Sequence, residues 1–365
     1  MLESYKNFNK LGGKMVIKEW NILRVIACLS IVFVHCMTQI GWSIGYPNID
    51  NYHFYRMILS YATPTFIVLS EIILANKYPD QMPQNFWKKR IKYIFIPYLA
   101  FAVIDAYVGL YLHPNTDVTR EIINNAVFGR YEGYFILIIF QFYALHYLVI
   151  KYKLSMTWMF PISIYLMAYY LDLLKLNPGL ESQYGMTIYV PFLGWFAYFT
   201  LAYMVGKNYK AVSSALVKYR WITILCFIIS LALMYFSYTY GYKGATSKRF
   251  DLLLFVVATS AMILAWGQKI PNYRIINIIS SYSFGIYLTH WQVQRLIAPH
   301  IASYFDHTST RVLALFFTSL FISMILIKLV SLLPFGSYIV GQVKKAKSKR
   351  AISPHKRIIP DPQQT

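Results

Sequence analysis

Ten apolar runs dominate this sequence and constrain its fold more than any other feature. A helix that crosses a membrane needs about 17 to 25 mainly apolar residues. Hydrophobic residues make up 57% of the 365 positions and charged residues 13%, a composition outside the range of ordinary soluble domains. The sequence therefore predicts an all-α integral membrane protein with about ten transmembrane helices, at residues 20–41, 56–75, 92–112, 134–150, 155–173, 187–206, 221–240, 251–267, 275–298 and 311–334.

Positive charges lie mainly on one side of this arrangement. If the amino terminus is cytoplasmic, 24 of the 35 lysines and arginines fall on cytoplasmic segments and nine on the opposite side. Because cytoplasmic loops carry the excess of positive charge in membrane proteins, we predict that both termini are cytoplasmic. The chain then divides into a cytoplasmic segment (1–19), a ten-helix transmembrane domain (20–334) and a basic cytoplasmic tail (335–365) facing anionic lipid.

The net charge of +21 does not indicate a nucleic-acid partner, because the sequence has no basic helix interleaved with stacking aromatic residues. Cys28, Cys36 and Cys226 all lie in apolar runs. Their spacing fits neither a metal site nor a disulfide framework, so we interpret them as core residues and expect no metal. No small-residue cleavage site follows the first span, so we interpret the polar amino terminus as the start of an anchor and not as a removable signal peptide.

Two ionisable side chains lie in the first span. Arg24 and His35 are eleven residues apart, close to three helical turns, which places them on one face about 16 Å apart along the axis. Ionisable groups at membrane depth are costly and usually mark function. His290 is predicted at a similar depth in the ninth span, which runs in the same direction. His35 and His290 are therefore candidates for one site, with a plain helix–helix hydrogen bond as the alternative for either histidine.

Glu71, in the second span, is predicted near the depth of Arg24. An arginine and a carboxylate at one depth in lipid are expected to pair, because either group alone would be far more costly. The alternative is that Glu71 lies at the cytoplasmic end of its helix and is solvated by headgroup water.

A basic cluster begins the third span, where the sequence reads "NFWKKRIKYIFIPY" and contains Lys88, Lys89, Arg90 and Lys92. Arginine forms paired hydrogen bonds with phosphate, and lysine supplies a mobile point charge. The cluster is therefore a candidate site for a polyanion. The alternative is a topology signal, since basic clusters flank the inner ends of most membrane helices.

Together these features resemble the membrane acyltransferase-3 family. The resemblance extends over nearly the whole chain, from residue 20 to residue 291, and agrees with ten spans. Four motifs match in order: an Arg and a His with ten residues between them (Arg24 and His35), "FFxLSG" (here "FIVLS", ending at Ser70), Arg-x-Arg followed by Pro and Tyr (Arg90, Lys92, Pro97 and Tyr98), and "SYxIYLxH" (here "SYSFGIYLTH", ending at His290).

The sequence departs from the family pattern at two positions. Lys92 stands at the second arginine position, which keeps the charge but loses bidentate geometry. Glu71 stands where the family usually has glycine. This glutamate, together with "GRYEGYFILIIFQFY" at the start of the fourth span, looks similar to the intercellular-adhesion branch associated with poly-N-acetylglucosamine. That branch has been described both as an exporter and as an O-succinyltransferase.

The resemblance implies a multi-pass enzyme of the plasma membrane. Such an enzyme takes an acyl group, acetyl or succinyl, from cytoplasmic acyl-coenzyme A and delivers it to a hydroxyl of a cell-surface or exported carbohydrate. A histidine suits the proton acceptor, because imidazole titrates near neutral pH. The expected partners are acyl-coenzyme A, a glycan or lipid-linked sugar and membrane lipid, and the oligomeric state is left open, with a homodimer as one option. The implied roles are catalysis for His35 and Arg24, donor binding for Arg90, Lys92 and Lys89, and further candidate positions at His290, Glu71 and Ser70.

Two rival functions use the same features. An exporter or flippase for a polysaccharide or lipid-linked sugar would line its path with the same intramembrane polar residues, and the 33 tyrosines and 8 tryptophans would suit sugar stacking. Interfacial aromatic belts explain much of that content, and the paired halves of many transporters are not evident here. A sensor or scaffold has no feature in its favour. Consumption of acyl-coenzyme A by the purified protein would separate enzyme from exporter.

Overall fold

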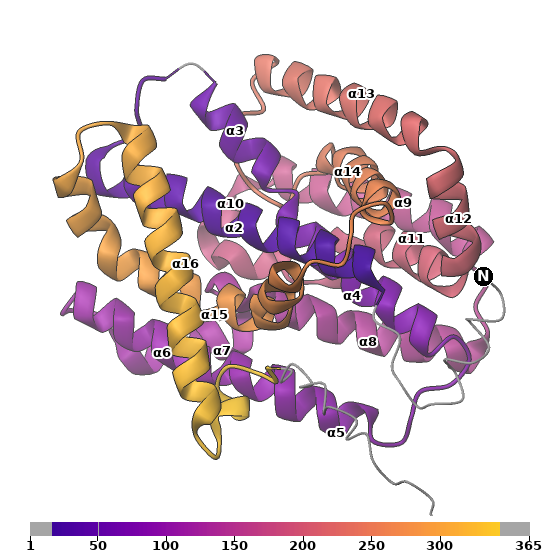
Figure 1. Cartoon of the computed structure of the whole chain (residues 1–365), viewed down its shortest axis with the longest axis horizontal. Helices are drawn as coiled ribbons and strands as arrows, with labels where there is room; N and C mark the ends of the chain where they lie inside the picture. Colours follow the sequence, from indigo (N-terminus) through magenta and orange to yellow (C-terminus); the bar gives the residue numbers. More distant parts are fainter. Residues whose placement is uncertain (1–16, 50, 344–365) are drawn as a thin grey trace, which may run out of the picture.

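The computed structural model describes residues 17–49 and 51–343, and within these ranges the chain forms helices and no strand (Figure 1). Most of the predicted segment 1–19 and of the basic tail 335–365 lies outside the described residues. The elements, in chain order, are α2 (Lys18–Ile44), α3 (Tyr52–Leu59), α4 (Ala62–Lys77), α5 (Phe86–Arg90), the π-helix η1 (Ile91–Phe95), α6 (Ile96–Leu112), α7 (Val118–Phe128), the 3₁₀ turn η2 (Glu132–Tyr134), α8 (Phe135–Tyr152), α9 (Met156–Leu176), α10 (Pro178–Tyr184), the 3₁₀ turns η3 (Gly185–Tyr189) and η4 (Phe192–Trp195), α11 (Phe196–Lys207), α12 (Tyr209–Lys218), α13 (Arg220–Thr239), α14 (Leu252–Gly267), α15 (Arg274–Tyr304), α16 (Thr308–Leu332) and the 3₁₀ turn η5 (Gly336–Tyr338).

Each of the ten predicted apolar runs is helical in the structure. Within the described ranges, seven helical stretches are long and apolar enough to cross a membrane. The remaining three runs correspond to α11 and α14, which are short, and to α15, which is long but less apolar. The prediction of an all-α integral membrane protein is confirmed, whereas the count of ten spans, the cytoplasmic termini and the domain boundaries remain predictions.

Helix α2 lies at the centre of the bundle, where α4, α14, α15 and α16 pack around it (Figure 1). α2 and α15 run in the same direction, because successive contacts join Asn21 to Asn277, Arg24 to Ser280 and His35 to His290. The expectation that the first and ninth predicted spans are parallel is therefore met. One face of α2 presents Arg24 and His35 to α15.

A π-helical turn, η1, joins α5 to α6 just before Pro97. Proline has no N–H to donate, and its ring clashes with the carbonyl four residues earlier in a regular α-helix. A wider turn at this point relieves that clash. The helix is therefore irregular just before Pro97, in the turn that carries Lys92 of the basic cluster.

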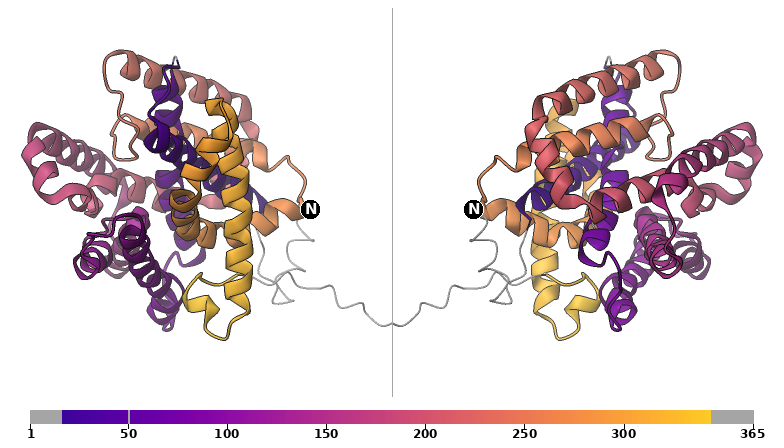
Figure 2. Two further views of the ribbon diagram at one scale, coloured as in Figure 1. Left: turned by 90° about the vertical axis from the view of Figure 1, so that its left-hand side faces the viewer. Right: turned by 90° about the vertical axis from the view of Figure 1, so that its right-hand side faces the viewer.

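Helix α13 lies at the periphery, packed on α14. The side views place α16 (yellow) and the segment around α9 and α10 (magenta) on opposite sides of the bundle (Figure 2). Cys28 and Cys36 are buried in the core as expected, but Cys226 is exposed on α13. The interpretation of Cys226 as a core residue is wrong because its helix presents most of its apolar surface outward, where lipid would cover it.

Candidate active site

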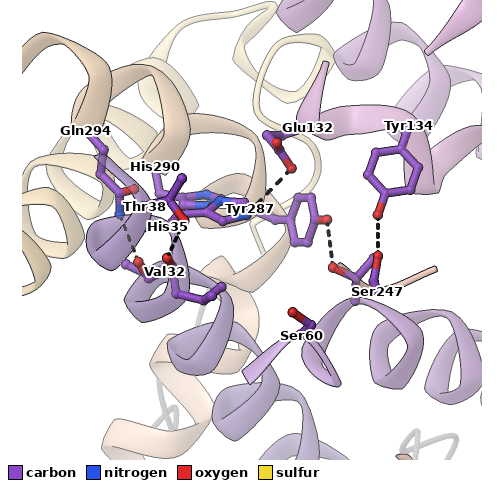
Figure 3. Close-up of polar contacts among 12 residues, drawn as sticks. Val32, His35, Thr38, Ser60, Glu132, Tyr134, Ser247, Tyr287, His290 and Gln294 are labelled. Atoms are coloured by element: carbon purple, nitrogen blue, oxygen red, sulfur yellow. Dashed lines mark hydrogen bonds and ion pairs between the residues drawn. The ribbon is translucent and has the colours of Figure 1, made fainter. Parts of the chain in front are cut away.

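Two histidines from α2 and α15 are in direct contact. His35 Nδ1 lies 2.9 Å from His290 Nε2, and the two rings are stacked with an interplanar angle of 15°. His290 is fully buried, while the side chain of His35 keeps 15% of its surface exposed. Figure 3 shows the two rings overlapping, with Glu132 pointing toward them. The sequence-based prediction that the two histidines lie at one depth is confirmed.

The hydrogen-bond partners of the two histidines indicate which ring nitrogen of each carries the proton. His290 Nδ1 lies 2.8 Å from the carbonyl oxygen of Ile286, which can only accept, so Nδ1 donates. In the neutral ring, His290 Nε2 is then an acceptor, and His35 Nδ1 must donate to it. The lone pair of His35 is left on Nε2, its more exposed side. His35 is thereby prepared to accept a proton, while both nitrogens of His290 are already engaged.

Glu132 faces this free nitrogen, with Oε2 3.6 Å from His35 Nε2. It lies in η2, in the turn between α7 and α8. The Tyr131 ring folds back over Gly133, where a Cβ atom would lie 2.2 Å from Tyr131 Cζ, so only glycine allows this turn. Tyr131 also donates from its hydroxyl to the Tyr98 carbonyl at 2.6 Å. These contacts fix a turn that directs a carboxylate inward.

Hydroxyl groups line the side of the site next to Glu132. The Tyr134 hydroxyl lies 2.8 Å from Ser247 Oγ, and the Tyr287 hydroxyl lies 3.5 Å from Thr63 Oγ1 (Figure 3). Ser247 belongs to the loop between α13 and α14, in which Arg249 binds Asp251 and backbone carbonyls of the same loop. This loop therefore has a fixed conformation beside the site.

A second polar network joins α15 to the third span beyond His290. Asp105 Oδ1 accepts from Gln292 at 2.7 Å and from Arg295 at 3.0 Å, and Asp105 Oδ2 accepts from Asn125 at 3.0 Å. Gln292 and Arg295 lie within two turns of His290. This network fixes the rotation of α15 and so helps to orient its histidine.

Arg24 contacts α15 and not Glu71. Its Nη1 donates to Ser280 Oγ at 3.1 Å, and Ser280 Oγ in turn lies 3.0 Å from Asn21 Oδ1. Within the part of the chain that the structure describes, no carboxylate lies within 4 Å of Arg24. A half-buried guanidinium therefore keeps an uncompensated charge among neutral oxygen atoms.

Glu71 pairs with His146 of α8. Its Oε1 lies 2.7 Å from His146 Nδ1, and His146 Nε2 lies 3.0 Å from the Tyr78 carbonyl. Glu71 is 1% exposed, so neither the pairing with Arg24 nor the solvated alternative is correct. Depth alone suggested Arg24, but Glu71 points toward α8, on another side of α4. Because His146 Nε2–H donates its hydrogen bond to the Tyr78 carbonyl, Glu71 and His146 Nδ1 share one proton across the 2.7 Å contact.

The basic cluster lies at the start of the third span, as predicted. The guanidinium of Arg90 lies 5.0 Å from the Phe86 ring centroid and 5.1 Å from that of Tyr143, and Lys92 Nζ lies 4.8 Å from that of Tyr338. Lys89 is exposed. Ser70, half-buried on α4, precedes Glu71 and is separated in sequence from both the histidines and the basic cluster. The structure thus assembles His35 with His290 and leaves Glu71 in a separate pair.

Glu132, His146 and Asn21 are site or neighbouring residues that the sequence reasoning did not identify. A signal for Glu132 existed, since it is a carboxylate immediately before the long apolar run that forms α8. Among the described residues, no group of three or more His, Cys, Asp or Glu side chains could hold a metal ion.

Comparisons with known proteins identify the family of the chain. Residues 17–328 match the family described as an acyltransferase domain. The chain is 38% identical over 299 residues to a Bacillus subtilis (strain 168) protein named as a membrane-bound acyltransferase, YfiQ, covering 76% of this chain and 80% of that protein. It is 27% identical over 294 residues to a Staphylococcus aureus (strain MRSA252) protein named as a poly-beta-1,6-N-acetyl-D-glucosamine export protein, covering 76% and 82%. A similarly named Staphylococcus epidermidis protein is 27% identical over 280 residues, covering 73% and 78%. No solved structure matches the chain.

Proposed function

The chain belongs to the acyltransferase-3 family of membrane proteins, and from that premise we propose that it transfers an acyl group from cytoplasmic acyl-coenzyme A to a hydroxyl of a carbohydrate at the outer face of the plasma membrane. The observation that carries this proposal is the hydrogen bond between His35 Nδ1 and His290 Nε2. This bond leaves the lone pair of His35 on Nε2, the nitrogen that faces Glu132. A general base needs a lone pair within hydrogen-bond reach of the proton it removes. The acyl group is proposed to be acetyl or succinyl.

The proposed reaction uses His35 twice. The acceptor hydroxyl oxygen attacks the thioester carbonyl carbon, and its proton moves to His35 Nε2. As the C–O bond forms, the C–S bond breaks, and the same nitrogen returns the proton to the departing thiolate. The imidazolium that exists between these steps is stabilised by the carboxylate of Glu132. His290 touches no reacting atom and is a positioning residue.

The inner end of the protein supports donor binding. Arg90, Lys89 and Lys92 lie at the start of the third span, where the phosphates of acyl-coenzyme A would meet charged hydrogen-bond donors. Arg24 lies eleven residues before His35 on the same helix face and carries an uncompensated charge. We propose that Arg24 orients the donor's polar thioester arm as it extends toward His35.

Export of a polysaccharide is the second candidate function. It is favoured by the staphylococcal relatives, which are named as export proteins. Export would not require a histidine with a free lone pair, nor turnover of a thioester. Release of coenzyme A by the purified protein in the presence of an acceptor therefore separates the two functions.

His35→Gln is the test of the proposed enzyme. Glutamine can still donate a hydrogen bond to His290 Nε2 and so preserves the packing, but it cannot accept a proton near neutral pH. We expect normal expression, retained binding of acyl-coenzyme A, and a rate lower by about 10²- to 10⁴-fold. His300→Gln, at an exposed position of α15, is the matched control and should leave the rate unchanged. Acylation of the surface glycan at the parental level in His35→Gln cells would refute the assigned role.

A further inference from the structure

Arg56, on α3, is held against the end of α2 that carries His35. Its Nη2 donates to Thr38 Oγ1 at 3.1 Å, and its Nη1 lies 3.3 Å from His53 Nδ1. Thr38 follows His35 by three residues, so the two side chains share one face of α2, about 4.5 Å apart along the axis. Arg56 is therefore placed about one helical turn outward from the proposed base.

A close approach of two chain segments fixes this position. The Tyr46 ring lies directly over Gly41, where a Cβ atom would be 2.2 Å from Tyr46 Cε1. The guanidinium carbon of Arg56 lies 4.5 Å from the centroid of the same ring. A larger residue at position 41 would displace the ring that supports the guanidinium. Arg56 is thus a positioned cation and not a freely solvated one.

Among the described residues, no carboxylate balances the charge of Arg56. Arg249 and Arg295 pair with Asp251 and Asp105, but Arg56 has no carboxylate within 4 Å among the residues in the described ranges. Its contacts are with a hydroxyl, an imidazole and a phenol ring, and its Nε is buried without a hydrogen-bond partner. A guanidinium in this state favours an anion, above all a carboxylate or phosphate that can accept two hydrogen bonds.

Aromatic rings extend from His35 to the surface on the same helix face. The centroid of the His35 ring lies 4.9 Å from that of Trp291, which lies 5.7 Å from that of Trp42. Trp42 is 63% exposed and follows His35 by seven residues, two helical turns along one face. Such rings offer flat apolar surfaces on which the carbon-bound hydrogens of a sugar can pack.

From these contacts we propose that the acceptor is an anionic saccharide. Its ring packs on the exposed ring of Trp42, its phosphate or carboxylate binds Arg56, and the hydroxyl to be acylated reaches His35 Nε2. The reactive role of that hydroxyl rests on the proposed function. Recognition of the charge is a separate binding step, which can be measured without any acyl donor.

The test is a titration of the purified full-length protein in lipid nanodiscs by calorimetry, without acyl-coenzyme A. Three probes share one sugar: methyl N-acetylglucosaminide is neutral, N-acetylglucosamine 1-phosphate carries a phosphate, and N-acetylmuramic acid carries a carboxylate. We expect a charged probe to bind more tightly than the neutral one. Arg56→Gln should lower the charged-to-neutral affinity ratio about ten- to a hundredfold. Arg56→Lys should keep part of the ratio, because it keeps the charge but loses the paired donors.

Arg120→Gln is the matched control, since it removes one exposed arginine from α7 and should keep the parental ratio. Equal affinities for all three probes, or an unchanged ratio in Arg56→Gln, would overturn the proposal. A second assay, with acyl-coenzyme A added, separates the two proposals. Release of coenzyme A with the neutral probe would leave the proposed function standing in each case, whereas binding of a charged probe with no release of coenzyme A from any probe would refute that function alone. The better-bound charged probe identifies the anion as phosphate or carboxylate.

Discussion

Replacing Glu132 with glutamine removes a negative charge 3.6 Å from His35 Nε2 and preserves the shape of the side chain. At that distance two unit charges interact by about 4.6 kcal/mol at an effective dielectric constant of about 20, and by about 1.2 kcal/mol in bulk water. The side chains of His35 and Glu132 are 15% and 26% exposed, so an intermediate value of about 2–3 kcal/mol applies. If the charge stabilises the imidazolium in the transition state, Glu132→Gln should react roughly 30- to 160-fold more slowly.

The assay follows release of the coenzyme A thiol by the purified protein in nanodiscs, at saturating acyl-coenzyme A and acceptor. Glu132→Asp retains the charge at a greater distance and should lose less activity. Glu121→Gln, on α7, removes a carboxylate from the same part of the chain away from the histidines and should retain the parental rate. The dissociation constant for acyl-coenzyme A should be unchanged in all three variants.

The proposed role of Glu132 fails if Glu132→Gln stays within about threefold of the parent while His35→Gln is inactive. In that case the imidazolium does not depend on this carboxylate. It also fails if Glu132→Gln loses acyl-coenzyme A binding to the same extent as rate, because the residue would then act on the donor and not on the charge that develops at His35.

Three further predictions concern the rest of the protein. Arg90→Ala should weaken acyl-coenzyme A binding by about 1.5–3 kcal/mol, whereas Lys92→Arg should be tolerated; unchanged calorimetric affinity in Arg90→Ala would reduce the cluster to a topology signal. Glu71→Gln can still donate a hydrogen bond to His146 Nδ1, so its thermal stability should be near parental. Glu71→Ala loses this bond and should lower the free energy of unfolding by about 1–3 kcal/mol. Equal melting temperatures of Glu71→Gln and Glu71→Ala would contradict the shared proton. Reporter fusions at the carboxyl terminus and in the loop between α6 and α7 should lie on opposite sides of the membrane, and a same-side result would refute the topology.

Periodicity and depth predicted the core of the site. The eleven-residue spacing placed Arg24 and His35 on one face of the first span, and both contact α15, at Ser280 and His290. This inference succeeded because the 3.6-residue repeat fixes which residues share a helix face. Composition predicted the helical membrane fold for a similar reason, since only the length and polarity of each run were needed.

Depth could not predict which neighbour a side chain faces. Glu71 and Arg24 were matched by distance along their helices, but the rotation of α4 directs Glu71 to His146. That rotation depends on how three helices pack together, which one sequence does not encode locally. Glu132 was missed for a related reason: its inward direction results from a glycine turn and from the folding of Tyr131 over Gly133, contacts that appear only in three dimensions.

The hydrogen bond from His290 to the Ile286 carbonyl also bears on the energy balance of the cell. A backbone carbonyl accepts a hydrogen bond but does not pass a proton onward, so the chain from His35 through His290 ends inside α15. A proton that the proposed base takes up at His35 Nε2 would therefore leave by the side from which it came. A membrane enzyme with a base at this depth could otherwise provide a path for ions down the electrochemical gradient. If His35 is the base proposed above, the closed end of the histidine pair would keep its acid–base chemistry from becoming a proton leak.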